Sequence, residues 1–112
     1  MAASQEVFRD DALLGKVILV TGGGGGLGKE IAHALAARMA TVHICGRRRA
    51  LLDATAAEIA AATGSRVIAH ACDIRDADAV EAMIESIWQD APLTGLVNNA
   101  AANFISPTKD LS

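Results

Sequence analysis

The chain has 112 residues, of which 52% are apolar, and a formal net charge of −3 at neutral pH. This length allows one domain, since domains commonly contain roughly 100–200 residues, and the apolar fraction excludes intrinsic disorder. The acidic balance gives no general attraction to nucleic acid, and no apolar run approaches the ~20 residues that span a membrane. The N-terminal residues lack the apolar segment of a secretory signal, and two cysteines do not make a disulfide scaffold. We therefore expect a cytoplasmic protein, with neither nucleic acid nor a membrane as its partner.

Short apolar segments rich in β-branched residues alternate along the chain with alanine-rich segments of helical period. In chain order, the pattern predicts a strand over 16–21, a helix over 27–39, a strand over 41–45, a helix over 50–62, a strand over 66–72, a helix over 76–89 and a strand over 94–98. Gly64 is placed to end the second helix. The larger apolar residues that mark the three helices are Ile31, Leu35 and Met39 in the first, Leu51, Leu52 and Ile59 in the second, and Val80, Ile84 and Ile87 in the third.

Strands that alternate with helices predict a parallel sheet with right-handed crossovers. The expected fold class is therefore α/β, a Rossmann-type doubly wound sheet, of which residues 1–112 form a four-strand portion. The fourth strand would be an open edge, where sheets of this kind normally continue. We therefore expect the chain to be the N-terminal part of one larger domain.

The strongest local feature is the run T-G-G-G-G-G-L-G from Thr21 to Gly28, between the first strand and the first helix. A pyrophosphate binds where backbone N–H groups gather at a helix N-terminus and no Cβ atom blocks its approach. We expect Gly22 to make the tight turn, Gly26 to let the backbone approach the phosphates, and Gly28 to let the helix pack closely. A flexible loop is the alternative, but the strand–glycine–helix context favours nucleotide binding, and the missing Lys-Ser/Thr pair excludes a P-loop. The predicted cofactor-binding residues of this run are Thr21, Gly22, Gly24, Gly25, Gly26, Leu27 and Gly28.

The glycine spacing T-G-x-x-x-G-x-G resembles the cofactor loop of the short-chain dehydrogenase/reductase family. A second mark of this family is the Asn98–Ala101 segment, N-N-A-A, at the end of the fourth strand, although Ala101 stands where the family usually has glycine. The resemblance extends from Leu14 to the end of the chain. It implies a nicotinamide dinucleotide as cofactor, a homo-oligomeric parent protein, and Asn99 and Ala100 as further cofactor-binding residues.

The end of the second strand indicates which nicotinamide cofactor would bind. Sites specific for NAD place an acidic residue there for the ribose 2′-hydroxyl, whereas a 2′-phosphate needs arginine. Here Arg47 and Arg48 follow the strand and no acid is present, which favours NADP(H) over NAD(H). The alternative is that these arginines merely solvate the start of a helix, where cations are electrostatically disfavoured. By resemblance, Asp73 would accept a hydrogen bond from the adenine amino group, with Ile74 beside it, although Asp73 could instead be a turn or N-cap residue.

The stretch from Asn98 to Ser112 is similar to the corresponding part of 2,4-dienoyl-CoA reductases, and the D-I-R segment from Asp73 to Arg75 also matches them. The resemblance implies that Arg75, Phe104 and Ser112 contact an acyl-CoA substrate. An arginine can pair with a CoA phosphate, a phenylalanine can pack on an acyl chain, and a serine can hydrogen-bond. A surface arginine, a core phenylalanine and an N-cap serine are the ordinary alternatives.

No catalytic residue is predicted within these 112 residues, because the chain contains no tyrosine and so no Tyr-x-x-x-Lys motif of the family. The resemblance implies a parent enzyme that transfers a hydride from NADPH to an enoyl thioester of fatty acid metabolism, and predicts that this chain alone is inactive. An ordinary carbonyl or alcohol dehydrogenase and a non-catalytic NADP(H)-binding module are the alternatives. The histidines and cysteines lack metal-ligand spacing, so no metal site is predicted, and Trp88 is expected to be a packing residue.

Overall fold

The computed structural model describes residues 11–99, which fold around a four-stranded parallel sheet in the order β3-β2-β1-β4. This order is the first part of the doubly wound 3-2-1-4-5-6 arrangement, and it confirms the predicted fold class. The strands and helices are β1 (Val17–Thr21), α2 (Gly26–Ala37), β2 (Thr41–Gly46), α3 (Arg49–Thr63), β3 (Val67–Ala71), α4 (Ala77–Asp90) and β4 (Gly95–Asn98). Among these, no helix is long and apolar enough to cross a membrane.

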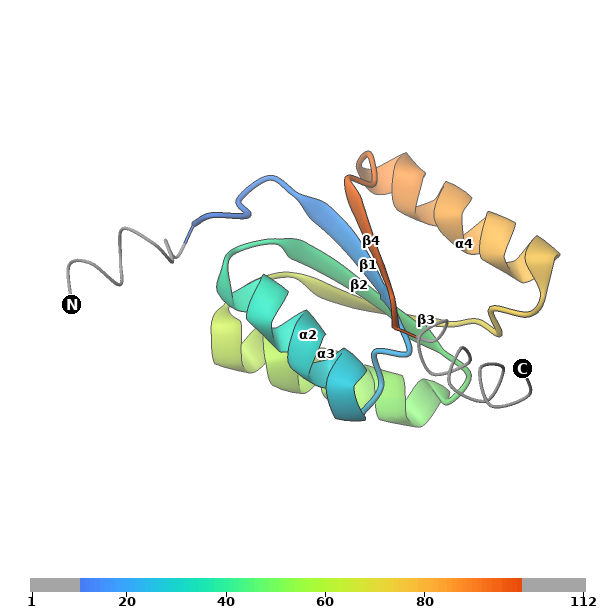
Figure 1. The fold of residues 1–112 in the computed structure, drawn as a ribbon, viewed down its shortest axis with the longest axis horizontal. Coiled ribbons are helices and arrows are strands. Elements are labelled where there is room, and N and C mark those ends of the chain that lie inside the picture. The colour runs from blue at the N-terminus through green and yellow to red at the C-terminus, as the bar shows by residue number, and fades with distance from the viewer. Residues whose placement is uncertain (1–10, 100–112) are drawn as a thin grey trace, which may run out of the picture.

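The sheet lies between two helical layers, with α2 and α3 on one face and α4 on the other (Figure 1). Alternate residues of a strand point to opposite faces, so each strand contributes to both cores. Val20, Val42 and Ile44 pack against α2 and α3, whereas Leu19 and Cys45 pack against α4. The two central strands are therefore buried on both faces, which explains why their sequences are continuously apolar.

Helix α2 packs on the sheet through small residues rather than through the large residues that mark its period. Ala32 and Ala36 are fully buried, while Ile31 and Leu35 are half-buried at the margin of the same core. The prediction was wrong for Met39: the helix ends at Ala37, and Met39 has a φ of 74° and is 47% exposed. Alanine side chains allow the helix axis to lie close to the sheet, which leaves the longer side chains at the sides.

Helices α3 and α4 follow their predicted patterns more closely. Gly64 ends α3 in the left-handed conformation, with a φ of 78°, which glycine adopts at no steric cost. In α4 the core residue Ile87 is joined by Met83, which the predicted stripe omitted. Trp88, which is expected to be a packing residue, is 54% exposed and does not belong to the buried core.

Strand β4 is an edge of the described sheet, as the sequence predicts. It pairs on one side with β1, from Ile18 with Gly95 to Thr21 with Asn98. Leu96 in this strand is 59% exposed. Because the strands are parallel, the carboxyl ends of β1, β2 and β4 lie side by side at one end of the sheet. Ligands of doubly wound folds bind at this end.

Candidate nucleotide-binding site

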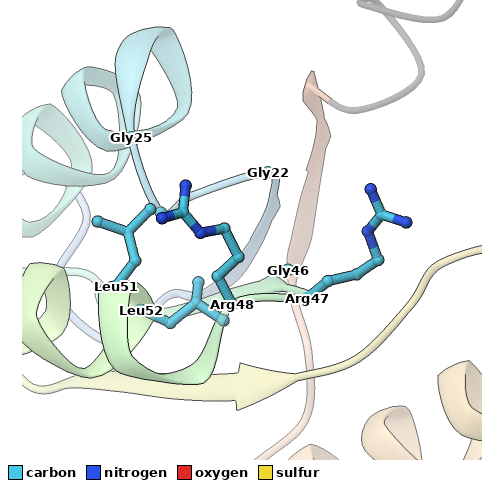
Figure 2. A pocket seen from close by; sticks show the side chains of 8 residues that line it. Gly22, Gly25, Gly46, Arg47, Arg48, Leu51 and Leu52 are labelled. Atoms are coloured by element: carbon cyan, nitrogen blue, oxygen red, sulfur yellow. The ribbon is translucent and has the colours of Figure 1, made fainter.

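A shallow pocket of about 190 Å³ lies at the carboxyl ends of β1 and β2 (Figure 2). Its wall on one side is the glycine run after β1, and its wall on the other side is the start of α3. The lining residues are Gly22, Gly24, Gly25, Gly46, Arg47, Arg48, Leu51 and Leu52. Five of these were predicted as cofactor-binding residues, and they come from two segments more than 20 residues apart in the sequence.

Gly22 and Gly28 show why the run between β1 and α2 needs glycine. Gly22 turns the chain out of β1 with a φ of +67°, and its N–H donates to the Cys45 carbonyl of β2 at 2.9 Å. At Gly28, an added Cβ would lie 1.9 Å from the carbonyl oxygen of Gly22. The first turn of α2 therefore lies directly against the loop that precedes it, as expected for a close phosphate-binding turn.

The helices that begin at this pocket have no side-chain caps. Helix α2 starts after Gly25 and helix α3 after Arg48, and neither residue makes a side-chain capping bond. Helix α4, by contrast, is capped by the Asp76 carboxylate, which accepts from the Ala79 N–H at 3.2 Å. Uncapped N–H groups and the positive end of the helix dipole attract anions. Both uncapped helix starts thus favour a negatively charged ligand at the pocket.

Three consecutive arginines add positive charge at the start of α3. Arg49 is neutralised by Asp53 at 3.1 Å, but within residues 11–99 neither Arg47 nor Arg48 forms an ion pair. Figure 2 shows the Arg48 side chain turning toward the glycine run, while Arg47 extends in the other direction. Both residues line the pocket, and the Arg48 guanidinium is the one that lies toward the glycine run, where it can receive a phosphate.

Polar side chains join the ends of β1 and β4 next to the glycine run. The Thr21 hydroxyl donates to the Asn98 side-chain oxygen at 3.0 Å. Asn99 is 6% exposed, and its amide nitrogen lies 3.5 Å from the Gly22 carbonyl oxygen. None of these residues lines the pocket. The contact between Asn99 and Gly22 instead helps to hold the glycine run in position.

Asp73 and Arg75 form a closed pair after β3. The Arg75 backbone N–H and Nε donate to one carboxylate oxygen at 3.0 and 3.1 Å, and a terminal nitrogen donates to the other at 2.9 Å. These hydrogen bonds lower the pKa of Asp73 to about 2. Asp73 therefore holds a turn, the ordinary role considered for it, while the N-cap of α4 is Asp76. The Arg75 side chain is 70% exposed, and its remaining terminal nitrogen carries no hydrogen bond within the described segment.

The other predicted site residues either lie within the described segment without lining the pocket or lie outside that segment. Leu27 and Ile74 are 60% and 41% exposed, and Gly26 is also at the surface. Ala100, Phe104 and Ser112 lie outside the described residues. Sequence reasoning missed Gly46, Leu51 and Leu52 as lining residues; the only signal was that a helix starting right after the arginines turns its first leucines back toward the glycine run.

His43 and His70 come together on neighbouring strands, with Nδ1 of His43 at 2.8 Å from Nε2 of His70. The pair lies on the face of the sheet that α4 covers, away from the pocket lining. Cys45 and Cys72 are buried free thiols, and burial raises the pKa of Cys45 to about 11. Between residues 11 and 99, no three His, Cys, Asp or Glu side chains gather to hold a metal ion.

The sequence matches the family described as short chain dehydrogenase over residues 16–112. A probable 2,4-dienoyl-CoA reductase of Caenorhabditis elegans is 44% identical over 109 residues, which cover 95% of this chain and 35% of that protein. The chain thus spans about a third of the length of this curated relative.

Two solved structures share both the fold and much of the sequence. A citronellol catabolism dehydrogenase of Pseudomonas aeruginosa has 42% identity and a TM-score of 0.78, covering 82% of this chain and 38% of its own. A metagenomic short-chain oxidoreductase in complex with NADP has 36% identity and a TM-score of 0.74, and the match covers 78% of this chain and 39% of that protein.

Proposed function

This chain belongs to the short chain dehydrogenase family, and from that premise we propose that it is the NADP-binding part of an oxidoreductase acting on 2,4-dienoyl- or enoyl-CoA thioesters. The observation that carries the proposal is the pocket lined by the glycine run together with Arg47 and Arg48, neither of which forms an ion pair within residues 11–99. Two uncapped helix starts add to the same positive field. We also expect a homo-oligomeric parent protein in the cytoplasm.

The charges at this pocket fit NADP better than NAD. A site for the 2′-hydroxyl of NAD would carry a carboxylate at the end of β2, whereas this chain continues from Gly46 into arginines. An NADP 2′-phosphate would relieve the repulsion between cationic side chains and the helix start. A guanidinium also matches a phosphate with two parallel hydrogen bonds. The solved NADP complex of a relative supports this choice.

The substrate class rests on the relative named as a dienoyl-CoA reductase and on the residues after β3. Arg75 keeps one terminal nitrogen for a CoA phosphate while its others hold Asp73. We assign Phe104 to the acyl chain and Ser112 to a hydrogen bond with the acyl-CoA substrate, and both residues lie outside the described segment. The bound nicotinamide would supply the hydride. The chain contains no tyrosine, and we propose that the groups that handle protons lie outside it.

The full-length protein that contains this chain tests the proposal directly. It should oxidise NADPH when a 2,4-dienoyl-CoA is added, and much more slowly with NADH at the same concentration. Absence of dienoyl-CoA turnover together with turnover of simple ketones would contradict the substrate assignment while leaving the cofactor assignment in place.

A second candidate is an ordinary carbonyl or alcohol dehydrogenase, which the similarity to a citronellol catabolism dehydrogenase favours. A third is a binding module without catalysis. The presence of a Tyr-x-x-x-Lys motif in the full-length sequence distinguishes the enzymes from the module, since that motif supplies the family's proton-handling groups. The ketone and dienoyl-CoA assays then distinguish the two enzymes.

A further inference from the structure

Thr55 is a buried residue of α3 whose hydroxyl leaves its own helix to reach the glycine run. Its side chain is 3% exposed, and Oγ1 donates to the Gly24 carbonyl oxygen at 2.8 Å. A helical threonine commonly bonds the carbonyl four residues earlier, as Thr63 does with Ile59 at 2.8 Å. Thr55 instead links two segments that are 31 residues apart in the sequence.

This hydrogen bond fixes the orientation of one peptide plane in the pocket wall. All described peptide bonds are trans, and in a trans peptide the carbonyl and the following N–H point in opposite directions. With the Gly24 oxygen held by Thr55, the Gly25 N–H points away from the Thr55 hydroxyl. Gly24 and Gly25 both line the pocket, and Gly25 is the N-cap of α2.

Without such a link, this plane would have little to hold it. Glycine has access to backbone conformations on both sides of φ = 0, so a peptide between two glycines can rotate at small steric cost. The run has glycine at every position from 22 to 26. Of the side chains described, the Thr55 hydroxyl is the donor to the Gly24 carbonyl.

We propose that Thr55 is a positioning residue for the cofactor, which holds the Gly24–Gly25 peptide so that its N–H faces the part that NADPH and NADH share. This inference rests on the proposed function. It divides the pocket into two parts with separate tasks: Thr55 orients the loop for either cofactor, while Arg47 and Arg48 select the 2′-phosphate. Loss of the Thr55 hydroxyl should therefore weaken the binding of both cofactors by the same factor.

The test is cofactor binding by the full-length protein with substitutions at Thr55. Thr55→Val keeps the side-chain shape and removes the hydroxyl. It should weaken the binding of NADPH and of NADH by about fivefold each, the effect of one ordinary hydrogen bond. Thr55→Ser should restore most of the affinity. Thr63→Val is the matched control, because it removes a threonine hydroxyl from the same helix far from the pocket.

The outcomes separate this inference from the proposed function. Equal affinities of T55V and the unmutated protein, an equal loss in T63V, or a loss confined to NADPH would each overturn the role of Thr55. If the unmutated protein binds neither cofactor, the proposed function fails and the inference fails with it. Should T55V not fold, T55S and T55A answer the same question, because they differ from each other by the hydroxyl alone.

Discussion

Arg47 and Arg48 are neighbours in the sequence, but their side chains leave the end of β2 in different directions (Figure 2). Arg48 turns toward the glycine run, and Arg47 extends toward Asp73, whose pKa it helps to lower. Sequence reasoning predicted both as contacts of the 2′-phosphate. It could not predict their directions, because side-chain orientation at an exposed helix start depends on the neighbouring loop.

Alanine substitution of these arginines should change cofactor preference rather than general binding. R47A and R48A are each expected to weaken NADPH binding by about tenfold, the effect of one charge-assisted hydrogen bond, and to leave NADH binding nearly unchanged. R66A is the control, because Arg66 precedes β3 at the opposite end of the sheet and pairs there with Asp90. Titration with each cofactor gives the ratio of the NADH and NADPH dissociation constants. If this ratio is the same in R47A, R48A and the unmutated protein, neither arginine contacts the 2′-phosphate.

The histidine pair is a residue-scale feature that only the strand register reveals. His43 stands opposite Ile68, and His70 stands opposite Cys45, so the two rings meet diagonally across β2 and β3. The Nε2 atom of His43 is buried without a hydrogen-bond partner among residues 11–99. A buried acceptor without a partner is less costly than a buried donor. We infer that Nδ1 carries the proton of His43 and donates it to His70.

This arrangement makes the folded state sensitive to acid. Burial, with smaller contributions from the charges of His70 and Arg66, lowers the pKa of His43 from 6.5 to about 4 despite the opposing charge of Asp90. Above pH 6.5 the ring is neutral in both folded and unfolded chains. Between pH 6.5 and about 4 only the unfolded state takes up the proton, so the free energy of unfolding should fall, by about 3 kcal/mol at most.

Denaturant unfolding at several pH values checks this expectation. The H43L variant should lose less stability than the unmutated protein between pH 6.5 and 5. Two curves that run parallel over that interval would contradict a neutral His43 in the folded state.

Element lengths and order follow from the sequence because each segment has its own period and stop signals. The strand over 41–45 and the stop at Gly64 are confirmed to within a residue. The packing face of α2 was less predictable, since hydrophobicity gives more weight to Leu35 and Met39 than to Ala36. Close approach of a helix to a sheet selects small residues, and a single sequence does not show how close that approach is.

The contact between α2 and its preceding loop gives an element-scale prediction. Gly28→Ala would place a Cβ 1.9 Å from the Gly22 carbonyl oxygen, so the helix start must move. We expect a loss of about 1–3 kcal/mol in the free energy of unfolding, typical of overpacking. The control is Gly25→Ala, because a Cβ there has no atom within 4 Å. Equal stability of the two variants would show that the loop and helix are not in close contact.

The residues of the candidate site that belong to a sequence motif were predictable. The residues that reach the site only through tertiary packing were not. The glycine run and the arginines after β2 were found from their types and order, and both line the pocket. Leu51 and Leu52 were missed because leucines at a helix start are indistinguishable from ordinary core residues. The Thr55–Gly24 bond was missed for a different reason, since a contact 31 residues apart leaves no local pattern.

At the scale of the whole molecule, the chain corresponds to about a third of its curated relative. It contains the pocket that we propose holds the adenosine and phosphate part of a dinucleotide, and it contains no tyrosine. We therefore expect the isolated 112-residue chain to show no oxidation of NADPH in the presence of a 2,4-dienoyl-CoA. A protein-dependent rate, measured by NADPH absorbance against a buffer blank, would show that proton-handling groups exist within this chain.

The most direct test of NADP binding is a titration of the full-length, unmutated protein with NADPH and NADH at the same ionic strength. We expect NADPH to bind at least about tenfold more tightly than NADH, because Arg47 and Arg48 line the pocket and form no ion pair among residues 11–99. Equal affinities, or tighter binding of NADH, would contradict the assignment of this pocket to a 2′-phosphate.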